Sequence, residues 1–213
     1  MSLSTRSFVA ATVVAATLTA GCATDPVPAP VLLTLPGAGS AAANGSDSAA
    51  STAASAVANQ PLLAVRRIAI PEYLVARRVR YRADPSTLGE WPNTFWAERI
   101  EIGVSREFVS ALRPQLPGWS LCENNCGDRA PTLAVQVDMV PMDYMRSAQR
   151  LQARARVVVS STGSNPRVLR TQEWTYELPA SADTAQAHAQ TVTELIRQVA
   201  TATASLVRAA APQ

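Results

Sequence analysis

The chain has 213 residues, of which 47% are hydrophobic and only 5% aromatic. This is enough for one domain of ordinary size, with a core of Val, Leu and Ile and a few tryptophans. The 19 basic residues, all arginine, are scattered along the sequence against 16 acidic residues, so the formal net charge is +3. Nucleic-acid-binding proteins gather positive charge in a stripe or motif, and we therefore expect no nucleic-acid partner.

The first 21 residues have the pattern of an export signal. Arg6 is the only charged residue among the first 24, an apolar run extends from Phe8 to Leu18, and small residues lead up to Cys22. These are the three regions of a secretory signal peptide. The apolar run falls short of the roughly 20 residues that cross a bilayer, so residues 1–21 are predicted to be a cleaved signal and not a transmembrane helix.

Cys22 closes the sequence Leu-Thr-Ala-Gly-Cys, which resembles a lipobox, so we expect a diacylglycerol group on its thiol. The alternative is an ordinary signal peptide cut near Ala20, with Cys22 left as a stray thiol. An unpaired thiol at the start of an exported protein is open to oxidation, and lipidation removes that liability. Ala23 follows where an aspartate tends to retain lipoproteins at the inner membrane, so we expect an outer-membrane anchor on the periplasmic face.

Three further segments follow the signal. Residues 22–36 are expected to form a tether that ends in a short strand from Val31 to Leu35. Residues 37–60 are almost entirely Ala, Ser, Gly, Asn and Thr and are predicted to be a disordered linker. We favour pairing of the early strand with the main sheet, which would make the linker an insertion between two strands. Residues 61–211 are predicted to form one periplasmic α+β domain.

Apolar periodicity assigns the first half of this domain. Residues 62–70 are predicted to form a half-buried strand, and the arginine-rich residues 73–81 an edge strand. Asn93 or Thr94 can cap a helix that ends near Arg113, because Pro114 follows. The apolar stripe of this helix is Trp96, Ile100, Val104, Phe108 and Leu112.

The second half is predicted to contain a strand at residues 132–140, a hairpin and a long helix. Residues 150–160 and 168–178 alternate in hydrophobicity around a polar loop, as the two strands of a hairpin do. Symmetric pairing about the loop would place Arg154 opposite Glu173, Arg150 opposite Glu177 and Ala153 opposite Trp174. The helix runs from about Asp183 to Ala210 with small residues on its inward stripe, so an antiparallel sheet with two helices packed on it is the expected architecture.

Few residues suit catalysis. The single histidine, His188, lies in the alanine-rich terminal helix and is expected at the surface or at its boundary. No nucleophile elbow, phosphate-binding loop or zinc-protease motif occurs. The carboxylate pairs are interpreted as solvated charges at strand and helix ends and not as a glycosidase dyad; they are Asp138 with Asp143 and Glu98 with Glu101. We therefore predict no catalytic residue, no metal, no cofactor and no enzymatic activity.

Cys122 and Cys126 bracket a polar Asn124-Asn125 turn. A zinc site would need two more ligands, and His188 is the only further histidine, so metal binding is disfavoured. In an oxidising compartment the two thiols are expected to form a disulfide, with modest stabilisation because the ring is short. A redox-active pair is the less favoured alternative, since no Cys-x-x-Cys at a helix start is present.

The chain resembles the PqiC-like auxiliary lipoproteins of ABC-type transport systems, which work with MCE proteins to move lipids between bacterial membranes. The resemblance lies in the run from Val65 to Leu74 and in Phe95-Trp-Ala-Glu98 at the start of a helix, and it extends over nearly the whole mature chain. The residues that carry most of it are Pro71, Tyr73, Leu74, Trp96, Ala97 and Glu98.

The resemblance implies a non-catalytic outer-membrane adaptor that docks on a periplasmic MCE protein, and a homo-oligomer is compatible with it. Tyr73 and Trp96 fit either an interface role or a plain role as core aromatics. Two other functions stay open at this stage. One is an envelope-structural lipoprotein unrelated to transport. The other is a periplasmic hydrolase, which would need two buried acids facing a cleft among Asp138, Asp143, Glu173 and Glu177.

Overall fold

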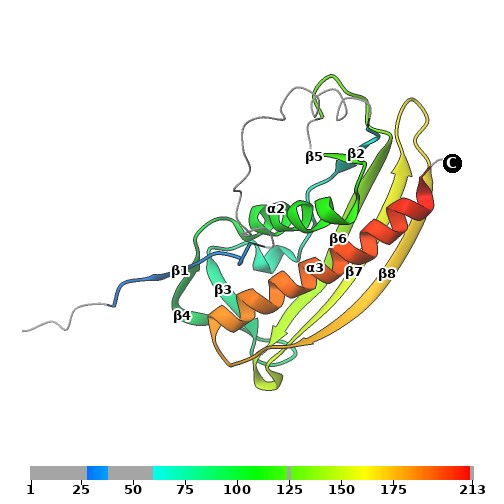
Figure 1. The fold of residues 1–213 in the computed structure, drawn as a ribbon. Coiled ribbons are helices and arrows are strands. Elements are labelled where there is room, and N and C mark those ends of the chain that lie inside the picture. Colours follow the sequence, from blue (N-terminus) through cyan, green and yellow to red (C-terminus); the bar gives the residue numbers. More distant parts are fainter. Residues whose placement is uncertain (1–27, 38–59, 124–125, 212–213) are drawn as a thin grey trace, which may run out of the picture.

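The computed structural model describes residues 28–37, 60–123 and 126–211, which form an α+β fold with two helices on one face of a single sheet (Figure 1). The strands are β1 (Val31–Leu33), β2 (Leu62–Val65), β3 (Arg78–Arg82), β4 (Leu88–Trp96), β5 (Ser120–Glu123), β6 (Leu133–Met145), β7 (Arg150–Ser161) and β8 (Val168–Pro179). The helices are α2 (Ile100–Leu112) and α3 (Ala185–Ala210). The α+β class and the two helices are confirmed.

The sheet is mixed, so the expectation of a purely antiparallel sheet is wrong. Its path is β1-β4-β3-β6-β2-β5, and β7 and β8 continue from the other side of β6. The β3–β4, β6–β7 and β7–β8 pairs are antiparallel, whereas the pairs β1–β4, β2–β5, β2–β6 and β3–β6 are parallel. Parallel neighbours are far apart in sequence, so local patterns do not reveal them.

The early strand pairs with the sheet, as expected. Val31 lies opposite Thr94 of β4, and Leu33 lies opposite Trp96. Asn93, in a left-handed backbone conformation at φ 49°, donates side-chain hydrogen bonds to the carbonyls of Pro28 and Ala29 at 2.8 and 2.9 Å. The path of the chain into β1 is thereby fixed. The predicted signal peptide, Cys22 and most of the predicted linker lie outside the described residues.

The helix predicted to start at Asn93 or Thr94 begins later. Those two residues belong to β4, and α2 starts at Ile100 after Arg99 at the cap position. Trp96 matched the helical stripe because it precedes Ile100 by four residues, but it is a buried strand residue. Trp96 pairs with Leu33 of β1 and contacts His188 of α3. These partners are distant in sequence, so no local pattern predicts the place of Trp96 in a strand.

Two strand predictions also need correction. Strand β2 ends at Val65. The remainder of the predicted 62–70 strand has a hydrogen bond from the Arg66 amide to the Val135 carbonyl and an isolated parallel bridge from Ala69 to Asp138. The predicted edge strand at 73–81 contains a 3₁₀ turn at Glu72–Leu74 followed by β3. That strand lies between β4 and β6, so it is not an edge. Strand β5 was not predicted, since four residues give no clear period.

The β7–β8 hairpin is confirmed, but its register differs from symmetric pairing by two residues. Ala155 lies opposite Trp174 and Ala153 opposite Tyr176, and a bulge between Val159 and Ser160 accounts for one of these two residues. The expected ion pairs still form as diagonal contacts, at 2.7 Å for Arg150 with Glu177 and 3.8 Å for Arg154 with Glu173.

The core lies between the two helices and the sheet. Val157 and Val159 of β7 and the inward stripe of α3 are fully buried, and α3 has the small residues that allow close approach to the strands. The Thr184 side chain accepts a hydrogen bond from the Ala187 amide and caps α3. Neither of the described helices is long and apolar enough to span a bilayer.

Candidate functional site

Arginine side chains and aromatic rings gather where β3 and β4 meet the end of β6. We call this the arginine–aromatic cluster, and it comprises Tyr73, Tyr81, Arg82, Trp91, Asp143, Tyr144, Arg146 and His188. Strands β3 and β6 share one backbone pair, Arg82 with Met145. Side-chain contacts therefore supply most of the attachment between the β3–β4 hairpin and β6.

Arg146 is the centre of the first group of contacts. Its guanidinium carbon lies 4.7 Å from the ring centroid of Tyr81 and 4.3 Å from that of Trp91. Its Nε donates to Asp183 at 3.0 Å, and its Nη1 donates to the Tyr81 hydroxyl at 2.9 Å. The ring of Tyr81 lies against Gly89, where a Cβ would be 2.5 Å from Tyr81 Cζ, so the packing needs glycine there. These contacts join β3 and β4 to the start of α3.

Asp143 is the centre of the second group. One oxygen, Oδ1, accepts hydrogen bonds from the Tyr73 hydroxyl and from Arg82 Nη2, both at 2.9 Å. The Arg82 guanidinium carbon also lies 5.1 Å from the Tyr73 ring centroid. Burial, together with the hydrogen bond to Asp143, raises the pKa of Tyr73. Tyr73 thus fastens the segment before β3 onto β6, and Asp143 is a structural carboxylate.

His188 is buried, which corrects its expected place at the surface or boundary. Its ring stacks on Tyr144 with centroids 4.6 Å apart and meets the edge of Trp96 at 6.2 Å. Its Nδ1 has no hydrogen-bond partner within the described residues. Burial lowers the pKa of His188 to about 4, so the imidazole is neutral at neutral pH. A general base needs access to a proton donor, and this ring faces other rings.

The candidate carboxylates are not brought together. Asp138 accepts from Gln136 at 3.3 Å and Asp143 from Tyr73, so the two are engaged separately on β6. Glu98 pairs with Arg106 at 2.7 Å, and Glu101 pairs with Arg99.

The hydrolase alternative required two buried acids facing a cleft. Glu173 and Glu177 are exposed on β8 and Asp138 and Asp143 are half-buried, so these four do not provide such a pair. No group of three or more metal-ligating side chains occurs in the part of the chain that the structure describes.

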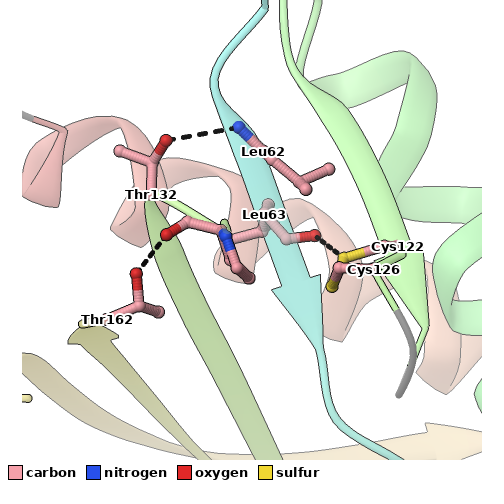
Figure 2. The surroundings of a disulfide bond; sticks show 7 residues. Leu62, Leu63, Cys122, Cys126, Thr132 and Thr162 are labelled. Carbon is pink, nitrogen blue, oxygen red and sulfur yellow. Dashed lines mark hydrogen bonds between the residues drawn. A yellow bond between two sulfur atoms is a disulfide. The ribbon is translucent and has the colours of Figure 1, made fainter. Parts of the chain in front are cut away.

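The opposite end of the sheet is held differently. Four residues of β2 pair with β5 and three with β6, in continuous parallel ladders. Cys122 and Cys126 lie at this end with their sulfur atoms bonded at 1.98 Å and their Cα atoms 5.2 Å apart. Figure 2 shows the Cys122 sulfur beside the Leu63 carbonyl, at 3.6 Å, and the Leu62 amide bonded to the Thr132 hydroxyl. The two cysteines predicted to pair are therefore adjacent in the fold.

Sequence reasoning missed most of the arginine–aromatic cluster. No local pattern singles out Arg82, Trp91 or Arg146, because their partners are on other elements. The residues behind the family resemblance are largely structural: Trp96 and Pro71 are buried, and Leu74 packs against the core. For Tyr73 and Trp96, packing is therefore the role that the contacts show.

The sequence is similar to one protein family and to two curated proteins of that kind. The family described as "ABC-type transport auxiliary lipoprotein component" matches residues 46–204. The intermembrane transport lipoprotein PqiC of Escherichia coli (strain K12) is 30% identical over 76 residues, which cover 36% of this chain and 41% of that protein. PqiC of Shigella flexneri matches to the same extent. The aligned part is thus less than half the length of these relatives.

Two solved structures share the fold. A crystal structure of an uncharacterized protein superimposes with a TM-score of 0.65 at 16% identity, covering 84% of this chain and 99% of that one. A crystal structure of a protein from Xanthomonas campestris gives a TM-score of 0.55 at 16% identity, covering 71% and 88%. At these identities the likeness concerns the fold alone.

Proposed function

Because the chain belongs to the family of ABC-type transport auxiliary lipoprotein components, we propose that it is the lipid-anchored adaptor of an intermembrane lipid-transport system. Acylation of Cys22 would hold it on the periplasmic face of the outer membrane. The domain would then bind a periplasmic MCE-family protein without catalysing a reaction. The observation that carries the proposal is the family match over residues 46–204.

The geometry of the candidate site supports binding over chemistry. In the arginine–aromatic cluster, Asp143 Oδ1 and the Nε and Nη1 of Arg146 are engaged by neighbours, and His188 is buried among rings. Groups engaged in this way stabilise a shape, which supports a binding role for this part of the chain. A rigid domain with a fixed surface is what an adaptor needs.

The face of β6, β7 and β8 away from the helices is the surface proposed for the partner protein. Arg154 and Glu173 lie on it as an exposed pair, and Val140 is an exposed apolar residue of β6. Mixed charge around a few apolar groups is typical of non-obligate interfaces.

Co-purification from solubilised membranes tests the proposal. We expect the acylated chain to bring down an MCE-family protein, and Arg154→Glu to weaken this association about tenfold by placing two acids side by side. Arg197→Glu on the exposed side of α3 is the matched control, with the association unchanged.

Recovery with peptidoglycan and never with an MCE protein would contradict the transport role. It would favour the envelope-structural alternative instead.

A further inference from the structure

Strand β1 presents apolar side chains at an edge of the sheet. Leu32 is 57% exposed and Val31 is 43% exposed. Within the described residues β1 pairs with β4 alone, so the other edge of β1 is open there. Consecutive strand residues point to opposite faces, and the edge is therefore apolar on both sides.

A row of three side chains leads from this edge across the sheet. Leu32 of β1 lies opposite Phe95 of β4, and Phe95 lies opposite Arg78 of β3. Directly paired residues point to the same face, and Leu33 and Trp96 beside them point into the core, so the row lies on the face away from the helices. We call Leu32, Phe95 and Arg78 the edge row.

The edge row is apolar at its rim and cationic two strands further in. The Arg78 guanidinium carbon lies 5.2 Å from the Phe95 ring centroid, and the Arg78 side chain is 53% exposed. Arg78 and Arg80 share one carboxylate, Glu90, at 3.4 and 3.2 Å, so this part of β3 retains positive charge. The neighbouring Arg77 is also exposed.

The length of the tether limits where this edge can be. Asn93 holds Pro28 and Ala29 against β4, and Cys22 precedes Pro28 by six residues. Six residues span at most about 20 Å when fully extended. An acyl chain on Cys22 would therefore keep Pro28 within about 20 Å of the bilayer surface, and β1 begins three residues after Pro28.

We propose that the edge row lies on an anionic phospholipid surface, with Leu32 at the headgroup boundary and the Arg78 guanidinium on lipid phosphate. This rests on the proposed lipid anchor. Arginine forms paired hydrogen bonds with phosphate, and its stem lies along apolar surface while the charge reaches the headgroups. The tether makes the contact intramolecular, so a small surface is sufficient. The edge row would then determine the orientation of the domain relative to the bilayer.

Spin labelling of the acylated full chain tests this. With Cys22 acylated and Cys122 bonded to Cys126, Leu32→Cys introduces a single reactive thiol for a nitroxide. The matched control is Val168→Cys. Val168 is a 65% exposed apolar residue at the start of β8, and β8 lies at the opposite edge of the sheet from β1 (Figure 1). Collision rates with oxygen and with a water-soluble nickel chelate are measured on vesicles of phosphatidylethanolamine and phosphatidylglycerol.

The expected result is a several-fold rise in the oxygen-to-nickel ratio at position 32 on these vesicles and no change at position 168. Arg78→Gln should reduce the rise to the level seen on phosphatidylcholine vesicles. Arg156→Gln, an exposed arginine of β7, should leave the rise unchanged.

Three other outcomes would overturn the proposal. If the protein floats with the vesicles while position 32 stays in water, the anchor stands and the edge row has no membrane contact. Spin–spin broadening at position 32 would mean that the labels of two chains lie close together, and the edge would then be a contact with a second copy of the chain. If mass spectrometry finds no acyl chain and the protein does not float, the lipid anchor fails as well.

Discussion

The two ends of the sheet are held together by different interactions. Strand β2 is joined to β6 on one side and to β5 on the other by continuous backbone ladders. The β3–β4 hairpin meets β6 through one backbone pair and the arginine–aromatic cluster. Backbone pairing tolerates many side-chain changes, whereas a cluster of charges and rings depends on each member. The β3–β4 end should therefore respond far more strongly to point substitutions and to pH.

The largest effect is expected for Tyr144→Ala. The ring of Tyr144 is 2% exposed, stacks on His188 and has a tilted contact with Trp91. Its loss should cost about 3–5 kcal/mol of unfolding free energy, measured by urea denaturation. Hydrogen exchange should speed up in β3 and β4 before β2 and β5. Equal loss of protection at both ends would contradict the comparison.

Acid should weaken the β3–β4 end through His188. Its pKa is about 4 in the fold and about 6.5 when exposed, so the unfolded chain takes up the proton first as pH falls. The full contribution is present above pH 6.5, and about 3 kcal/mol is lost between pH 6.5 and pH 4. Phe does not titrate, so the unfolding free energy of the wild type minus that of His188→Phe should fall by this amount from pH 6.5 to pH 4. A constant difference across that range would refute the assignment.

Removal of the Arg82 charge should have an intermediate effect. Arg82→Met leaves Asp143 half-buried with only the Tyr73 hydroxyl as a donor among the hydrogen bonds described, which should cost about 2 kcal/mol. Arg154→Met is the control, because its partner Glu173 lies 3.8 Å away and both are exposed. That change should cost no more than ~0.5 kcal/mol. If Arg82→Met and Arg154→Met lower the unfolding free energy equally in chemical denaturation, the cluster does not contribute more than an exposed ion pair.

The smallest effect is expected at the other end. Replacement of Cys122 and Cys126 by serine opens a short ring, so the loss should be about 1–2 kcal/mol. Faster hydrogen exchange should be confined to β5 and its neighbour β2. Loosening of β3 and β4 in this variant would mean that the two ends are coupled.

The sequence predicted those parts of the fold that depend on neighbouring residues. The β7–β8 hairpin and helix α3 follow from local periodicity, and both are present. The last residues of strand β4 match the pattern of a helix, because Trp96 continues the spacing of the apolar stripe of α2. Its partners, β1 and β3, are distant in sequence and leave no local trace.

The candidate site was harder to predict for the same reason. Arg146 stacks on Tyr81 and Trp91, which precede it by more than fifty residues. The burial of His188 depends on Tyr144 and Trp96 from two other elements. The proximity of Cys122 and Cys126, by contrast, follows from their separation of four residues in the sequence.

The lipid anchor proposed at Cys22 underlies both the proposed function and the proposed membrane contact. Intact-mass and peptide mass spectrometry of the protein extracted from membranes tests it directly. We predict that residues 1–21 are absent and that Cys22 is the first residue and carries acyl chains. A mature chain with an unmodified Cys22, or one that retains residues 1–21, would contradict the account.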